Sequence, residues 1–220
     1  MTYKVFAFDA YGTLFDVHSA VGAMRKQIGP EAARLSDIWR TKQLEYTWVR
    51  TLAGSYLDFM ELTTQALDFA APQCGGISAD LRKTLLQSYQ TLEAYPDVKP
   101  ALQKLRDAGI RTAILSNGTP AMLESASRAA GIEGLIDHAI SIDTIRRYKT
   151  VPEVYALVEG LTGALPGEVS FQSSNRWDIA GAKKFGFRPV WVNRTNQPDE
   201  YSDLPPAHTI STLSQLTGLT

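Results

Sequence analysis

Short apolar runs alternate with helix-like segments along most of this chain, and this alternation restricts its fold more than any other feature. Four runs have the composition of buried strands and a weaker one resembles them; they cover residues 5–8, 112–115, 169–171, 190–192 and, for the weak run, 139–142. The segments between them carry apolar residues at helical spacing, as in residues 98–105, and Gly109 then follows as a helix-ending residue. Strands separated by crossover helices predict an α/β fold with a doubly wound parallel sheet.

Residues 16–93 interrupt the alternation, because they contain no strong strand run. Three stretches there, residues 32–52, 55–71 and 78–92, read as amphipathic helices. A helical block inserted after the first strand would lie over the carboxyl edge of the sheet, where open α/β sheets bind ligands. We therefore expect residues 1–15 and 94–220 to form the core and residues 16–93 to form a helical cap. Residues 196–209 are expected to be a proline-rich loop that leads into a short terminal element.

Charge and composition exclude several classes of function. The formal net charge is −1 and no basic run is present, so we expect no nucleic-acid partner. No apolar stretch approaches the roughly 20 residues that cross a bilayer, so we expect no membrane partner. Cys74 is the single cysteine, which rules out an internal disulfide, and the N-terminus does not resemble a signal peptide. A cytoplasmic protein is the expectation that follows.

Polar side chains that could carry out chemistry stand at the ends of the predicted strands. They are Asp9 and Thr13; Ser116 and Asn117; Lys149; and Ser173, Ser174, Asn175 and Asp178. Because parallel strands end at one edge of a sheet, these residues are expected to meet there.

Each of these residues has an ordinary structural explanation when it is taken alone. Asp9 could cap a turn or helix, Ser116 or Asn117 could cap a helix after Thr119, and Ser174 or Asn175 could cap the next helix. Lys149 and Arg40 could be solvated surface residues. The occurrence of a candidate at each strand end, in the right order, is what points to a site.

Other kinds of active site find little support in the sequence. The three histidines, His18, His138 and His208, are dispersed and lack the paired spacing of a zinc helix. The chain also lacks a glycine-rich phosphate loop with its lysine and a G-x-S-x-G nucleophile turn.

The chain contains four motifs, "FDAYGT", "ILSNG", "YKT" and "SSNRWD". They resemble the four motifs of the haloacid dehalogenase superfamily and occur in the same order. The longer stretches "FDAYGTLFDVHS", "WRTKQLEYTW", "AILSNG" and "SSNRWD" are similar to its L-2-haloacid dehalogenase branch. This resemblance implies a Rossmann-like core with an inserted helical cap, and a homodimer. It also implies hydrolysis of short-chain (S)-2-haloacids to (R)-2-hydroxy acids and halide, with a small 2-haloalkanoate as substrate.

Tyr11 separates this branch from the phosphatases of the superfamily, which carry a second acid at that position to protonate the leaving group. Tyrosine is a poor acid at neutral pH unless its pKa shifts far. Ser174 and Asn175 stand where metal-binding carboxylates are expected, and Mg²⁺ prefers anionic oxygen ligands. Halide leaves as a stable anion and needs no proton. The sequence therefore favours dehalogenation with no metal and no cofactor.

The resemblance also implies the catalytic roles. Asp9 would attack the halogen-bearing carbon and form an ester, Lys149 would keep Asp9 ionised, and Asp178 would activate the water that hydrolyses the ester. Arg40, helped by Asn117, would receive the halide.

The remaining roles concern binding and orientation. Ser116 and the backbone N–H groups of the first turn would hold the substrate carboxylate. The orienting residues would be Thr13, Ser173, Asn175 and Tyr155. The substrate pocket would be lined by Tyr11, Leu44, Phe59 and Trp177, with Thr41 also in contact with substrate.

Three positions depart from the pattern of the branch. Thr41 replaces a common glutamine, Thr150 replaces the proline that commonly follows the lysine, and Arg176 stands where a small residue is common. Arg176 is expected to point to solvent.

Two other functions stay open at this point. A Mg²⁺-dependent phosphatase of the same superfamily would act on p-nitrophenyl phosphate and not on chloroacetate. A non-catalytic binding protein on the same fold would keep its function after Asp9→Asn.

Overall fold

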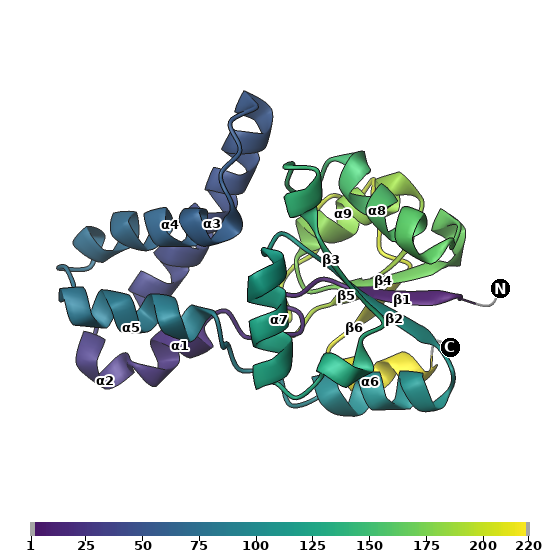
Figure 1. The fold of residues 1–220 in the computed structure, drawn as a ribbon, viewed down its shortest axis with the longest axis horizontal. Coiled ribbons are helices and arrows are strands. Elements are labelled where there is room, and N and C mark those ends of the chain that lie inside the picture. Colours follow the sequence, from purple (N-terminus) through teal and green to yellow (C-terminus); the bar gives the residue numbers. More distant parts are fainter. Residues whose placement is uncertain (1–2, 219–220) are drawn as a thin grey trace.

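A six-stranded parallel sheet forms the centre of the computed structural model, which describes residues 3–218 (Figure 1). The strands lie in the order β3-β2-β1-β4-β5-β6, and each neighbouring pair is parallel. Their bounds are β1 Val5–Phe8, β2 Arg111–Ser116, β3 His138–Ser141, β4 Val169–Ser173, β5 Arg188–Val192 and β6 His208–Ile210. The predicted α/β class and parallel sheet are confirmed.

Strand β1 lies in the middle of the sheet because all four of its residues are apolar and fully buried. Phe8 pairs with Ile114 of β2 on one side and with Gln172 of β4 on the other. The chain first builds the sheet outward through β2 and β3 and then returns to β4 on the opposite side of β1. This reversal of direction beside β1 is the position where open α/β sheets bind ligands.

Four helices follow the strands as crossover connections. They are α6 Val98–Asp107, α7 Pro120–Ala129, α8 Pro152–Thr162 and α9 Arg176–Phe185. Helices α8 and α9 lie over one face of the sheet and α6 lies over the other (Figure 1). Gly163 and Gly186 end α8 and α9 in left-handed conformations, with φ of 68° and 109°.

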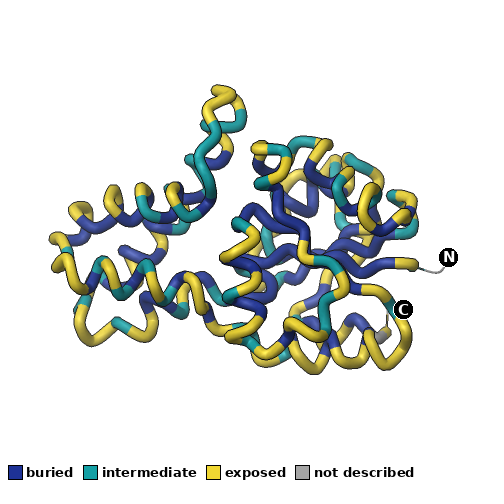
Figure 2. The backbone as a smooth tube through the Cα atoms, viewed as in Figure 1, coloured by how far each residue is buried: buried dark blue, intermediate teal, exposed yellow. Residues whose placement is uncertain are grey.

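Five further helices lie together beside the sheet (Figure 1). They are α1 Ser19–Ala23, α2 Arg25–Ile28, α3 Ala32–Ala53, α4 Phe59–Gln73 and α5 Ala79–Tyr89. Buried positions line the sides where these helices face one another, and exposed positions cover their outer sides (Figure 2). Asp58 begins α4 with a capping box, because its carboxylate accepts from the backbone N–H of Glu61 at 2.9 Å. The sequence predicted α3, α4 and α5 but not the two short helices.

The segment 196–209 was predicted as loop up to its last residue, whereas β6 already begins at His208. This edge strand is three residues long and two of them are exposed, so it has no apolar run to reveal it. Among residues 3–218, no helix combines the length and apolar character needed to cross a bilayer.

Arg176 does not point to solvent, contrary to the expectation from sequence. The side chain is buried; its Nε donates to Asp199 Oδ1 at 2.6 Å, and its Nη2 donates to the carbonyl oxygens of Tyr201 and Leu204 at 3.1 Å. A long guanidinium at the start of α9 reaches several acceptors of one loop, so it anchors the 199–204 segment against the core.

Candidate active site

Asp9 lies one residue beyond β1, where its backbone N–H still donates to Gln172 of β4 at 2.9 Å. Its carboxylate is buried and accepts hydrogen bonds on both oxygens. Oδ1 accepts from Lys149 Nζ at 3.0 Å. Oδ2 accepts from Thr13 Oγ1 at 2.9 Å, Asn175 Nδ2 at 2.7 Å and Ser173 Oγ at 3.4 Å. Asp9 is therefore the centre of a polar cluster and not the cap of a turn or helix.

Lys149 joins the two buried carboxylates of this cluster. Its Nζ lies 3.0 Å from Asp9 and 2.7 Å from Asp178, and its side chain is fully buried. Burial lowers the pKa of Lys149, but the carboxylates of Asp178 and Asp9 raise it by more, so the pKa lies above its ordinary value. The ammonium group therefore stays charged between the two acids.

Asp178 lies in the first turn of α9 and is fully buried. Its Oδ1 accepts from the hydroxyl of Tyr155 at 2.8 Å. Burial raises the pKa of Asp178 to about 6, the charge of Asp9 adds to this effect, and Lys149 and Tyr155 oppose it. A carboxyl with such a pKa can accept a proton near neutral pH, which suits a general base.

Gly181 leaves the space that Tyr155 needs. A Cβ added at this glycine would lie 2.3 Å from Tyr155 Oη and 2.8 Å from Cβ of Thr150. The hydroxyl of Tyr155 can approach Asp178 because α9 has no side chain at position 181.

The loop after β2 brings Ser116 and Asn117 to the same edge. Ser116 Oγ accepts from the backbone N–H of Gly118 at 3.0 Å, and Asn117 Oδ1 accepts from the backbone N–H of Lys149 at 3.2 Å. Thr119 is the residue that caps α7, through its hydroxyl and the N–H of Met122. Capping therefore does not explain Ser116 and Asn117.

Asn175 occupies the first position before α9, but its side chain makes no capping hydrogen bond. Its amide donates instead to Asp9 and, at 3.2 Å, to the carbonyl oxygen of Tyr11. Ser174 donates its backbone N–H to Thr13 Oγ1 at 2.8 Å, which links the ends of β1 and β4.

Arg40 reaches this edge from α3. Its Nη2 donates to the carbonyl oxygen of Tyr11 at 3.0 Å and lies 3.5 Å from Asn175 Oδ1. Its Nη1 donates to Gln43 Oε1 at 2.8 Å. Arg40 thus connects the helical block with the sheet and is not a solvated surface residue.

Gln43 and Tyr89 were missed by the sequence analysis, although both are buried beside Arg40. Gln43 Oε1 also accepts from the hydroxyl of Tyr89 at 3.0 Å. The signal that could have revealed Gln43 is a polar amide on the buried face of an amphipathic helix, one turn after an arginine.

Aromatic side chains surround the cluster on the side of the helical block. The ring of Tyr11 stacks on Tyr89 with centroids 5.8 Å apart and contacts Phe59 at 5.4 Å. Trp177 of α9 meets Trp48 of α3 edge to face at 5.6 Å. Of the remaining predicted pocket residues, Leu44 is half-buried on α3, whereas Thr41 is exposed on that helix.

The hydroxyl of Tyr11 is buried and has no hydrogen-bond partner within residues 3–218. Burial raises the pKa of Tyr11 above its ordinary value, and Tyr89 adds to this effect. The residue at the position of the second acid therefore holds its proton firmly.

The donor set does not fit a magnesium ion. The ammonium group of Lys149 lies within 3.0 Å of both carboxylates, where a divalent cation would need to lie. Ser174 and Asn175 add no negative charge, and the described part of the chain contains no group of three or more His, Cys, Asp and Glu side chains placed to hold a metal.

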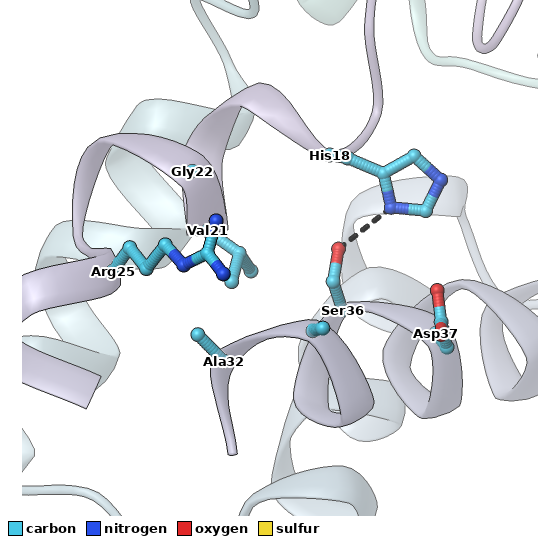
Figure 3. A pocket seen from close by; sticks show the side chains of 8 residues that line it. His18, Val21, Gly22, Arg25, Ala32, Ser36 and Asp37 are labelled. Carbon is cyan, nitrogen blue, oxygen red and sulfur yellow. Dashed lines mark hydrogen bonds between the residues drawn. The ribbon is translucent and has the colours of Figure 1, made fainter. Parts of the chain in front are cut away.

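A separate hollow of about 300 Å³ lies among the helices α1 to α3 (Figure 3). His18 and Ser36 face each other there, with His18 Nδ1 2.7 Å from Ser36 Oγ. None of the predicted site residues lines this hollow. A larger cleft of about 530 Å³ lies where α3 meets α9, and Lys149 and Trp177 are among its lining residues.

A family model and several known proteins match this chain over most of its length. A model of the family "haloacid dehalogenase-like hydrolase" matches residues 3–186. The chain is 49% identical over 213 residues to (S)-2-haloacid dehalogenase 1 of Pseudomonas sp. strain CBS-3, covering 96% of this chain and 94% of the relative. It is 43% identical over 195 residues to haloacetate dehalogenase H-2 of Moraxella sp. strain B, covering 87% and 86%.

Solved structures are also similar. That of L-2-haloacid dehalogenase from Xanthobacter autotrophicus with chloropropionic acid covalently bound is 36% identical, with a TM-score of 0.90 over 99% of this chain and 98% of the other. The extent of the similarity and the family match place the chain in the haloacid dehalogenase superfamily. Within that superfamily, the chain belongs to the L-2-haloacid dehalogenase branch.

Proposed function

We propose that this protein is an (S)-2-haloacid dehalogenase, which hydrolyses short-chain (S)-2-haloacids to (R)-2-hydroxy acids and halide through an ester on Asp9. The observation that carries the proposal is Lys149, whose ammonium group joins the carboxylates of Asp9 and Asp178 in a buried site. One lysine can keep a nucleophile ionised and hold a base beside it. The relatives named above support the same reaction.

The first step is displacement of the halide by Asp9. Within residues 3–218, Oδ2 accepts from three donors, whereas Oδ1 accepts only from Lys149, so Oδ1 is the oxygen with a lone pair available for attack. Oδ1 forms a bond to the α-carbon from the side opposite the halogen, and the halide leaves with the electron pair of the broken bond. The displacement inverts the α-carbon, so an L-2-haloacid gives a D-2-hydroxy acid.

Arg40 receives the departing halide together with Asn117. The guanidinium of Arg40 donates a hydrogen bond to the carbonyl oxygen of Tyr11, two residues after Asp9, and this bond holds the cation close to the reacting carboxylate. A guanidinium is more weakly hydrated than an ammonium group, so it suits an anion in a partly dry pocket. Ser116 and the backbone N–H groups of the first turn hold the substrate carboxylate.

Water hydrolyses the ester in the second step. Asp178 accepts a proton from the water as the water oxygen attacks the carbonyl carbon of the Asp9 ester. The tetrahedral intermediate then expels the hydroxy acid oxygen, which takes the proton held by Asp178. Asp9 loses the second proton of the water to solvent and returns as a carboxylate, so that Asp178 and Asp9 are both ready for another cycle. Tyr155 orients Asp178 for this step through its 2.8 Å hydrogen bond.

The other site residues orient these groups or form the wall of the pocket. The carboxylate of Asp9 is oriented by Thr13, Ser173 and Asn175, each of which donates a hydrogen bond to it. The wall comprises Tyr11, Leu44, Phe59 and Trp177, with Thr41 at the outer side of α3. A water-poor wall strengthens the charge interactions on which the displacement depends.

Residues 16–93 act in this proposal as a cap over a core of residues 1–15 and 94–220. The position of Arg40 supports this division, because a side chain of the helical block reaches the carboxyl edge of the sheet. The enzyme would work as a cytoplasmic homodimer without a metal or cofactor.

A single turnover in ¹⁸O-labelled water with excess enzyme tests the ester. Solvent oxygen should appear in the peptide that contains Asp9 and be absent from the first hydroxy acid released. Labelled product with unlabelled Asp9 would refute the ester and make Asp9 a general base.

A further inference from the structure

Gln43 is buried on α3, and within residues 3–218 its side chain forms hydrogen bonds with three others, one of which is the guanidinium of Arg40. Its exposed fraction is 1%. Oε1 accepts from Arg40 Nη1 at 2.8 Å and from the Tyr89 hydroxyl at 3.0 Å, and Nε2 donates to Thr63 Oγ1 at 2.6 Å. A buried amide with these partners is held in one orientation.

The proton positions around Gln43 follow from Thr63. Its hydroxyl donates to the carbonyl oxygen of Phe59 at 2.6 Å, so the Thr63 oxygen can only accept from Gln43. The NH₂ group of the amide must therefore face Thr63, and the carbonyl oxygen must face Arg40. Thr63 itself is held by the indole N–H of Trp39, which donates to its backbone carbonyl at 2.8 Å.

Within residues 3–218, the hydrogen-bond acceptors of Arg40 share one property, which is that they are neutral. They are the amide oxygen of Gln43, the carbonyl oxygen of Tyr11 and, at 3.5 Å, the amide oxygen of Asn175. A carboxylate in the place of Gln43 would hold the guanidinium equally well but would cancel its charge. In a half-buried site such cancellation weakens the attraction for a further anion.

We propose that Gln43 is a positioning residue for halide release, which orients the guanidinium of Arg40 while leaving its full positive charge for the departing halide. This inference rests on the proposed dehalogenase function and on the role of Arg40 within it. Gln43 acts through Arg40 and not on the substrate. Its effect should therefore fall on formation of the Asp9 ester, when the halide leaves, and not on hydrolysis of that ester.

The test compares Gln43→Glu with Gln65→Glu. Gln65 is an exposed residue of α4 whose Oε1 accepts from Arg50 Nη2 at 3.3 Å, so this control makes the same change beside another arginine of the helical block. Single-turnover mixing with 2-chloropropionate measures separately the release of halide, which accompanies ester formation, and the release of hydroxy acid, which follows ester hydrolysis. Inhibition by added bromide reports binding of the anion itself.

For Gln43→Glu we expect halide release to slow by about ten-fold or more and bromide inhibition to weaken by a similar factor. Hydroxy acid release from the ester should stay within about two-fold of the parent. Gln65→Glu should change none of the three quantities.

Gln43→Met serves as a second variant, because it keeps the length and neutrality of the side chain but removes the acceptor. It should also slow halide release selectively, since the guanidinium loses its anchor. A folded variant of either kind with the halide-release rate and bromide inhibition of the parent would overturn the role of Gln43, as would equal slowing of both steps. If the parent forms no ester on Asp9, the proposed function itself fails, and the two failures are thus distinguishable.

Discussion

Replacing Asp178 by asparagine removes a fully buried charge with little change in shape, so we expect it to stabilise the fold at neutral pH and to stop the reaction after one halide per site. The carboxylate has no exposed surface and lies near the charge of Asp9. Burial is the main reason why its pKa rises from an ordinary 3.8 to about 6, in spite of the opposing effect of Lys149. The folded protein thus holds the ionised form of Asp178 at an energetic cost.

The magnitude and sign follow from this pKa. A carboxyl whose pKa is higher in the folded than in the unfolded state binds protons more tightly when folded. The free energy of unfolding therefore falls as the pH rises from the unfolded-state pKa to the folded-state pKa. A rise from 3.8 to about 6 corresponds to about 3 kcal/mol. Asparagine carries no charge and avoids this loss. The stability difference between Asp178→Asn and the parent should therefore grow in favour of the variant by about 2 to 3 kcal/mol between about pH 4 and pH 8, because the unfolded carboxyl is already partly ionised at pH 4.

Urea unfolding across that pH range, at one fixed protein concentration, measures the difference. Asp203→Asn is the matched control, because Asp203 is exposed and lies far along the chain in the loop before β6. This control makes the same chemical change at a side chain that stays in contact with water, so it shows whether an effect of Asp178→Asn depends on burial.

The catalytic effect is measured on the same variant. Without the base, the Asp9 ester should accumulate, so mixing with 2-chloropropionate should release one chloride per site and increase the mass of the peptide that contains Asp9. A stability difference that is constant with pH would refute the explanation of the Asp178 pKa by burial. Continued turnover at the parent rate would remove Asp178 from the mechanism.

Four further predictions address other parts of the site. Arg40→Lys keeps the charge but loses the planar fork, so kcat on chloro- and bromo-substrates should fall by about ten-fold or more; an unchanged kcat would make Arg40 a surface residue. Tyr11→Phe should leave kcat within about two-fold of the parent value, because halide needs no proton and the hydroxyl has no partner among residues 3–218. A hundred-fold loss of steady-state activity would show that the hydroxyl acts in catalysis. Gly181→Ala should lower the free energy of unfolding by about 1–3 kcal/mol and slow ester hydrolysis, because the new Cβ would lie 2.3 Å from Tyr155 Oη. The control is Gly160→Ala in α8, where a Cβ meets nothing within 4 Å, and this variant should not be destabilised in the same urea assay. Dialysis against EDTA should leave chloride release intact, and a loss that Mg²⁺ restores would contradict the proposed metal independence.

Residues near the ends of strongly apolar strands were the part of the site that the sequence could predict. Asp9 follows β1 directly and Asp178 lies one turn into the helix after β4, so the parallel arrangement of the strands alone brings them to one edge. Lys149 was harder to place, since it follows the weakest strand after a short 3-10 turn. The motifs of a known family supplied its role.

Residues that act through a second element were harder to find. Gln43 and Tyr89 belong to no sequence motif. Their hydrogen bond depends on how α3 packs against α5 and against the loop after β1 that contains Tyr11. Arg176 reads as a surface residue in the sequence, because nothing there shows that the 199–204 loop returns to offer it a carboxylate and two carbonyl oxygens. Strand β6 is too short to be seen without its partner β5.

The sequence by itself determined the class of fold, because apolar runs of strand composition separated by amphipathic helices have few other ways to bury their surface. It also determined that an acid would lie at the end of the central strand. Only the tertiary structure decided which oxygen of Asp9 is less occupied by donors, how Asp178 comes to have a raised pKa and why Arg40 has neutral hydrogen-bond acceptors. Each of these properties depends on distances of about 3 Å between side chains far apart in sequence, and such distances are set by the packing of whole elements and not by local pattern.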